Sequence, residues 1–243
     1  MNRPALKAAP WALLFGRTAL FLIFQALFAL AYRLAGAPQS WTAGAAWWPA
    51  AVTLANVVCL GAMLAISKKE GLSYWSLFAL RRERVGRDLL ALAGTLLIAG
   101  PAGYFPNILL AGWLFSDSTT ALNLLVMPLP RLAAYSLLVI FPLTQALVEL
   151  PLYFRFVQPR LESQRVPAWL ALTLCAVMLG LQHIAAPFQP VGAFILWRGL
   201  MFLPFAFVAG GILRWKPGLL PYMAVIHFLM DFSFAMMLLP VMV

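Results

Sequence analysis

The feature that most constrains this chain is a series of seven apolar runs, most near 20 residues long, separated by segments that hold most of the charges. An α-helix rises 1.5 Å per residue, so about 20 apolar residues cross the ~30 Å hydrocarbon core of a bilayer. In lipid a helix satisfies its own backbone hydrogen bonds within one segment. The sequence therefore predicts an all-α, polytopic transmembrane helical bundle of about seven spans.

Composition excludes the other common classes of protein. Hydrophobic residues make up 64% of the chain and charged residues 10%, against ~45–50% and ~25% in an average soluble domain. A soluble globule of 243 residues could not hide this much apolar surface. An ordinary cytosolic enzyme and a disordered chain are therefore excluded. Both cysteines, Cys59 and Cys175, lie inside apolar runs, which favours simple packing over a disulfide framework.

The apolar runs and their breaks give approximate bounds for the spans. We expect them near residues 18–32, 47–66, 89–115, 132–158, 168–186, 191–213 and 219–239. Prolines at Gly100-Pro101 and Pro106 predict a kink or break in the third span. Residues 116–130 carry no basic residue and read as a loop, and the aromatic stretch 74–80 suits a short helix in the membrane interface.

The basic residues predict the orientation in the membrane. The chain has 17 Lys and Arg against 7 Asp and Glu, and its basic clusters at the N-terminus and near 67–88, 160–165 and 214–216 fall on one side of the seven-span arrangement. By the positive-inside rule that side is cytoplasmic. We therefore expect an integral protein of a bacterial inner membrane, N-terminus inside and C-terminus outside. Its partner is the lipid bilayer, and no nucleic acid is expected. Arg198, near the outer end of the sixth span, departs from this pattern.

Polar residues inside the apolar runs are the candidates for function. Five of the seven acidic residues lie in expected loops, namely Glu70, Glu83, Asp88, Asp117 and Glu162. The others are Glu149 in the fourth span and Asp231 in the seventh, and the only histidines are His183 and His227. At 1.5 Å per residue, all four lie ~13–22 Å from the cytoplasmic ends of their spans. Ionisable groups at this depth are costly and mark a function by default.

Two imidazoles and two carboxylates can carry out hydrolysis. A buried carboxylate can accept a proton from water, and imidazoles can orient that water, bind a metal or donate to an oxyanion. The same residue types also form interhelical hydrogen bonds and proton pathways. The four groups alone therefore do not choose between hydrolysis, transport and a structural role.

Three short motifs add a resemblance to a known family. The stretch V-E-L-P-L-Y-F-R at 148–155 is similar to the E-E-x-x-x-R motif of the CPBP family, the CAAX prenyl endopeptidases and their bacterial relatives, also called Abi. L-G-L-Q-H at 179–183 is similar to F-x-x-x-H, and H-F-L-M-D at 227–231 matches H-x-x-x-D. The resemblance covers about 132–239. These residues belong to an expected core bundle that spans residues 132–243. Residues 1–131 contain the first three spans and the basic loop 67–88, and both parts form one integral membrane domain.

The resemblance implies an intramembrane endopeptidase that acts on a membrane-associated protein or peptide. It implies that Glu149 is the general base that activates water and that His183 assists it. His227 and Asp231 would stabilise the oxyanion, and His183, His227 and Asp231 are candidate ligands of a divalent metal such as zinc.

Two departures from the first motif keep other functions open. The usual pair of glutamates is reduced to Glu149, and Arg155 follows it by six residues, which places it ~120° around an ideal helix. Pro151 is expected to alter that register, and Arg155 also reads as a cytoplasmic anchor. The alternatives are a non-catalytic CPBP-like scaffold or bacteriocin-immunity protein, and a small proton-coupled transporter. A transporter favours an inverted repeat, and none is visible in the sequence.

Overall fold

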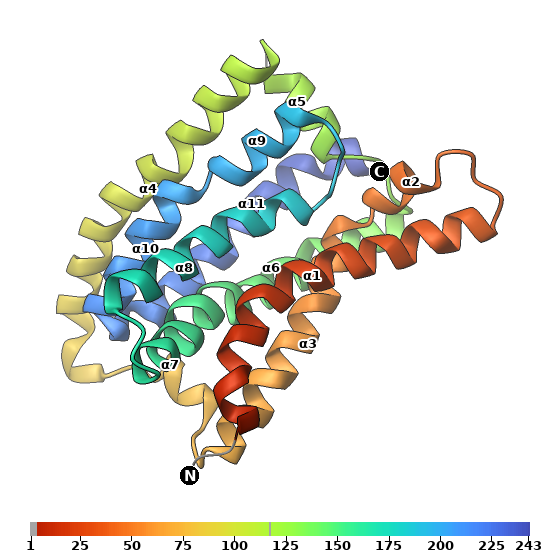
Figure 1. The fold of residues 1–243 in the computed structure, drawn as a ribbon. Coiled ribbons are helices and arrows are strands. Elements are labelled where there is room, and N and C mark those ends of the chain that lie inside the picture. Colours follow the sequence, from red (N-terminus) through yellow and green to blue (C-terminus); the bar gives the residue numbers. More distant parts are fainter. Residues whose placement is uncertain (1–3, 117) are drawn as a thin grey trace.

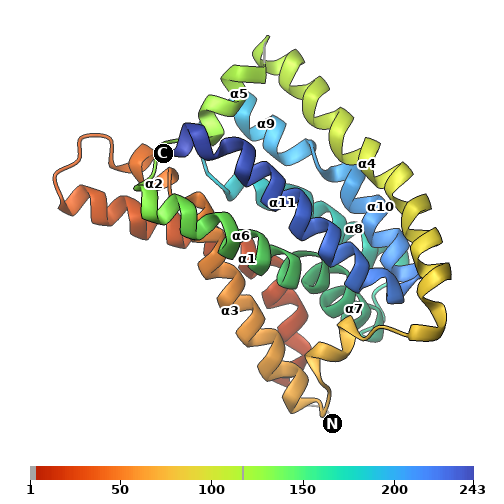
Figure 2. The same ribbon diagram turned by 180° about the vertical axis from the view of Figure 1, so that it is seen from behind.

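The computed structural model describes residues 4–116 and 118–243, so Asp117 lies outside the described residues. Over these two ranges the chain is helical and contains no strand. Seven helical segments are long and apolar enough to cross a membrane. The prediction of an all-α polytopic bundle is confirmed, and Figures 1 and 2 show its helices from two sides.

The helices follow one another with short connections. In chain order they are α1 (Pro4–Leu34), α2 (Ser40–Ala45), α3 (Trp48–Lys69), α4 (Val85–Phe115), α5 (Ser118–Leu125), α6 (Arg131–Leu150), α7 (Gln158–Ser163), α8 (Ala168–Leu181), α9 (Gly192–Leu200), α10 (Leu203–Trp215) and α11 (Leu220–Met242). A π-helix, η3 (Pro151–Val157), joins α6 to α7. Four short 3₁₀ turns complete the chain: η1 (Tyr74–Phe78), η2 (Arg82–Arg84), η4 (Gln182–Ala185) and η5 (Pro217–Leu219).

Several predicted bounds are wrong, and the largest error is in the first span. Helix α1 begins at Pro4, so Arg17 lies in the middle of a long helix. A charge can occupy that position because it finds partners inside the bundle. The fourth span continues beyond Pro159 to Ser163. Pro159 lies just after the π-helix η3, and the chain remains helical through it.

The predicted third span and the loop after it also differ from the structure. Helix α4 runs through Pro101 and Pro106 without a break. Membrane helices tolerate proline when neighbouring groups satisfy the freed carbonyls. The predicted loop 116–130 contains the short helix α5. The expected interfacial helix near 74–80 is the single 3₁₀ turn η1, whose Tyr74 is buried while Trp75 is exposed.

Helix α6 occupies the centre of the bundle. It packs against α3 on one side and α11 on the other, and α1 packs against α3. On the far side of the molecule, α8 packs against α10 and α10 against α4. Figure 2 shows α11 on the near face beside α6. The span that contains α6 is the most buried of the seven, and the spans of α4 and α11 are among the least buried. A residue on the inner face of α6 is therefore reached from many helices.

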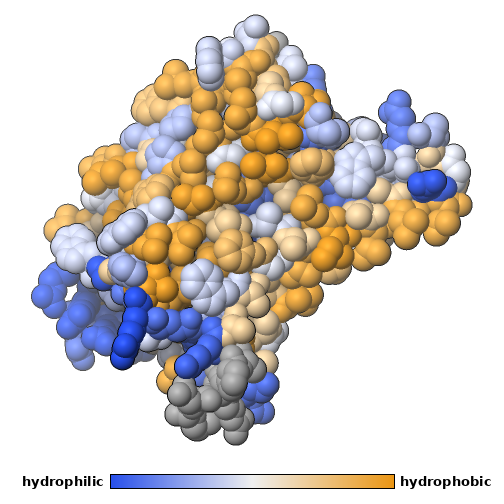
Figure 3. Space-filling view, viewed as in Figure 1, coloured by the Kyte–Doolittle hydropathy of each residue, from blue (hydrophilic) through white to orange (hydrophobic). Residues whose placement is uncertain are grey.

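The surface separates into an apolar belt and a hydrophilic end. Figure 3 shows hydrophobic residues over most of the visible face, and hydrophilic ones at the lower end, where Figure 1 places α7 and the start of α4. The exposed basic side chains include Lys68, Lys69, Arg81, Arg82, Arg84 and Arg87. An apolar belt with most of the exposed charge toward one end is typical of an integral membrane protein.

Candidate functional site

A cavity of about 510 Å³ lies inside the bundle, and all four predicted site residues line it. Glu149 comes from α6, His183 from η4, and His227 and Asp231 from α11. Most of the other lining residues are apolar, and α4 and α11 contribute more of them than any other element. The volume is within the ~300–1,000 Å³ typical of ligand sites. The structure thus brings the four residues together around one space.

The imidazole of His227 lies between two carboxylates. Its Nε2 is 3.3 Å from Oδ2 of Asp231, one helical turn away on α11, and 3.6 Å from Oε1 of Glu149. Residues four apart lie on one helical face. The packing of α11 on α6 brings the pair to Glu149. Nδ1 of His227 has no hydrogen-bond partner among the described residues.

His183 is held by its own helix. Its Nδ1 lies 2.9 Å from the carbonyl oxygen of Leu179 and 3.2 Å from that of Gly180. A carbonyl only accepts, so Nδ1 carries a proton and donates it. In the neutral ring Nε2 is then the acceptor nitrogen. The ring packs against Phe202 with a centroid distance of 4.7 Å. His183 therefore contributes a basic nitrogen to a site that its own backbone keeps in position.

A residue that sequence reasoning missed, Arg17, completes the site from α1. It is fully buried, and its Nη1 donates to Oε2 of Glu149 at 3.1 Å. The same guanidinium donates to Asn56 of α3, at 2.9 Å and 3.1 Å, and to Gln145 of α6 at 2.5 Å. It also donates to the side-chain oxygen of Gln182. Arg17 thus ties α1 to three other elements of the bundle.

The two oxygens of Glu149 have different surroundings. Oε2 accepts from Arg17 and also from the amides of Gln145 and Gln182, each at 2.9 Å. Oε1 faces His227. Tyr153 donates to Gln182 at 2.9 Å and extends the buried network. One oxygen is therefore fixed by three donors, and the other remains for the cavity.

The sequence carried a signal for this network. Apolar residues continue on both sides of Arg17, from Ala8 to Phe15 and from Ala19 onward. Arg17 is thus an ionisable residue within an apolar run, which is the same signal that identified Glu149 as a candidate. Asn56, Gln145 and Gln182 also lie inside predicted spans. What the pattern could not supply was the pairing, because Arg17 and Glu149 are 132 residues apart.

The structure gives the suggested metal site no support. Among the described residues, no three His, Cys, Asp or Glu side chains gather as ligands of one ion. A structural or catalytic zinc site needs at least three protein donors around one point.

Arg155 lies in the π-helix, outside the residues that line the cavity. It is half-buried, and its Nε has no hydrogen-bond partner among the described residues. The π-helix begins at Pro151, which has no N–H for the carbonyl of Leu147. Tyr74 donates to that carbonyl instead, at 2.5 Å. The expectation that Pro151 alters the helical register agrees with this wider turn.

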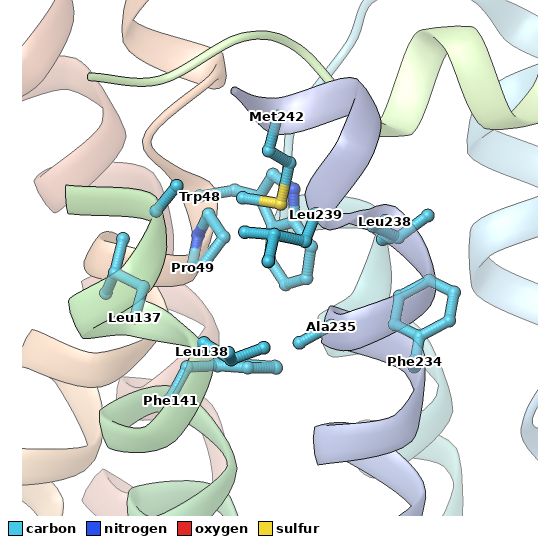
Figure 4. A pocket seen from close by; sticks show the side chains of 11 residues that line it. Trp48, Pro49, Leu137, Leu138, Phe141, Phe234, Ala235, Leu238, Leu239 and Met242 are labelled. Carbon is cyan, nitrogen blue, oxygen red and sulfur yellow. The ribbon is translucent and has the colours of Figure 1, made fainter. Parts of the chain in front are cut away.

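A second, much smaller crevice lies between α3, α6 and α11 near Met242. Its volume is about 20 Å³, and apolar side chains line it. Figure 4 shows Trp48, Leu138 and Phe234 around this space, with Met242 at its end. A crevice of this size holds one water at most, and its walls offer no titratable group. Chemistry therefore belongs to the larger cavity.

Comparison with protein-family models finds no match, and comparisons with curated proteins and with solved structures find none either. The resemblance to the CPBP family rests on the three short motifs alone.

Proposed function

We propose that this chain is an intramembrane endopeptidase of the CAAX prenyl protease type, which hydrolyses a peptide bond with water activated by Glu149. The observation that carries the proposal is the two-sided environment of this carboxylate. Three N–H donors hold Oε2, and Oε1 faces His227 inside a largely apolar cavity. A general base needs such a fixed, ionised oxygen within reach of water.

In the proposed reaction, water binds between Oε1 of Glu149 and the imidazoles. The water oxygen attacks the substrate carbonyl carbon while Oε1 accepts one of its protons. An N–H of His227 donates to the oxyanion that forms. The carbon–nitrogen bond then breaks, and the proton held by Glu149 passes to the departing nitrogen. The products are a carboxylic acid and an amine, and Glu149 returns to its ionised form.

Arg17 acts as a positioning residue in this scheme. It balances the charge of Glu149 within the membrane, where an isolated carboxylate would be very costly. Asp231 has the same relation to His227, since its Oδ2 lies 3.3 Å from Nε2. Glu149 is thus paired with a guanidinium, and His227 is paired with a carboxylate.

The test is a cleavage assay on the purified chain in liposomes. The probe is a farnesylated reporter peptide, together with the same peptide without the farnesyl group. Release of a C-terminal fragment by the wild type, and its loss in His183→Ala and His227→Ala variants, would support the proposal. Equal behaviour of the wild type and both variants would contradict it, provided that all three proteins show the same thermal stability.

A specific observation favours a second candidate, the non-catalytic scaffold. Arg17 is fully buried, and its pair with Oε2 of Glu149 is surrounded by hydrogen bonds to side-chain amides, as a purely structural pair would be. A scaffold needs the pair but not the His183 imidazole. His183→Ala would then leave the biological phenotype unchanged, whereas a hydrolase would lose it.

We also propose that the N-terminus is cytoplasmic and that the protein resides in a bacterial inner membrane. The exposed basic side chains between α3 and α4 support this orientation. Reporter fusions to the 67–88 loop and to the C-terminus test it. The loop fusion should report the cytoplasm and the C-terminal fusion the opposite side; the reverse result would overturn the orientation.

A further inference from the structure

Arg198 is a second buried arginine, and the reaction proposed above does not use it. It lies on α9, is 5% exposed and lines the same cavity as Glu149 and His183. Its Nε donates to the backbone carbonyl of His183 at 3.1 Å, so its guanidinium lies directly beside that residue.

The partners of Arg198 within the chain are electrically neutral. Besides the carbonyl of His183, its Nη2 donates to the carbonyl of Ala186 at 2.6 Å. Its Nη1 has only a 3.9 Å contact with the sulfur of Met201. None of the ion pairs formed by residues 4–116 and 118–243 includes Arg198. One edge of a buried guanidinium therefore lacks a strong acceptor.

Arg17 shows what a balanced arginine looks like in the same bundle. Its guanidinium meets the carboxylate of Glu149 and three side-chain amide oxygens. Leaving a charge buried and unpaired is strongly unfavourable. A buried arginine in a membrane protein usually pairs or marks a ligand pathway. Arg198 has no ion-pair partner among the described residues, and it lines a cavity. It therefore fits the description of an arginine that marks a ligand pathway.

A structural role explains only part of the geometry. The carbonyls of His183 and Ala186 belong to the turn that ends α8 and η4, and a cation there satisfies the free C-terminal carbonyls of a helix. That role uses Nε and Nη2. In the part of the chain that the structure describes, it leaves Nη1 with only the sulfur of Met201 as a neighbour.

We propose that Arg198 binds the carboxylate of an amphiphilic ligand whose apolar part fills the cavity. A guanidinium is suited to a carboxylate because its N–H groups form two parallel, charge-assisted hydrogen bonds. The neighbouring wall is apolar and includes Trp197, Met201 and Phe202. Two sources supply this chemistry: the free C-terminus of an apolar peptide, and a fatty acid. Binding does not depend on the proposed hydrolysis, so it can be measured without turnover.

The experiment compares each carboxylate with its amide. The probes are an N-acetylated apolar tripeptide with a free C-terminus and its C-terminal amide, and hexadecanoic acid and its amide. Each is radiolabelled and bound to the full chain in nanodiscs, with empty nanodiscs subtracted. The wild type should prefer the carboxylate by ~10–100-fold in at least one pair, as expected for a charge-assisted contact. Preference in the peptide pair identifies a C-terminus, and preference in the lipid pair alone identifies a fatty acid.

Three variants make the result decisive. Arg198→Gln should abolish the preference and leave binding of the amide unchanged, which shows that the cavity is intact. Arg198→Lys, which keeps the charge but not the planar fork, should retain part of the preference and serves if Arg198→Gln does not fold. Arg214→Gln is the matched control, since Arg214 pairs with Glu162 at the surface. The proposal fails if the wild type shows no preference, or if the position-198 variants keep it in full.

Discussion

The two sides of Glu149 differ in how completely their polar groups are satisfied. On the side of α1 and α3, Arg17 is fully buried and its guanidinium meets four side-chain acceptors. On the side of α11, His227 and Asp231 border a cavity, and each has a polar atom without a hydrogen-bond partner among the described residues. Satisfied buried networks rigidify a bundle, whereas unsatisfied groups beside a cavity are available to water or a ligand. The first side is suited to stability and the second to chemistry.

Replacing Glu149 should affect both sides and have the largest effect. Glu149→Gln removes the proton acceptor, which typically costs ~10²–10⁴-fold in rate. It also leaves the charge of Arg17 buried and unpaired, which costs about 3–5 kcal/mol of stability. Cleavage of the reporter peptide and thermal unfolding in detergent measure the two effects.

The double variant Arg17→Gln/Glu149→Gln separates these effects. Without the buried charge, it should regain much of the lost stability but none of the activity. Arg33→Gln is the control for α1, because Arg33 is exposed near the end of the same helix. If Glu149→Gln unfolds at the temperature of the wild type, the idea that the Arg17 pair stabilises the bundle is wrong.

His183→Ala should affect the cavity and leave the Arg17 network unchanged. The imidazole is hydrogen-bonded to carbonyls of its own helix and not to the Arg17 network, so unfolding should change little. Loss of its basic nitrogen should lower cleavage by about 10²-fold. A large fall in the unfolding temperature with proportionate loss of activity would instead make His183 a structural residue.

Tyr74→Phe should affect stability alone and have the smallest effect. The phenol donates to the Leu147 carbonyl that Pro151 leaves without its helical donor. Loss of this bond should cost about 1–3 kcal/mol, the typical penalty for an unsatisfied buried acceptor. Cleavage per folded molecule should be unchanged. Tyr135→Phe, at an exposed tyrosine of α6, is the control and should alter neither quantity.

The sequence predicted the four site residues more accurately than the buried residues that hold them in place, above all Arg17. Glu149, His183, His227 and Asp231 could be found because each interrupts an apolar run, and three of them lie near the middle of a predicted span. Arg17 was placed outside the first span, because a basic residue near an N-terminus also fits the positive-inside rule. Only the structure shows that α1 starts earlier and carries Arg17 to Glu149.

The sequence by itself determined the membrane class, the all-α architecture and the seven spans, because these follow from local hydropathy and helix length. Tertiary structure decided which polar groups pair. It set Arg17 against Glu149 and left Arg198 with neutral partners, although both are arginines within largely apolar helices. Pairing across more than a hundred residues depends on how the helices pack and turn against each other. Hydropathy describes each helix against lipid and carries no information about that packing.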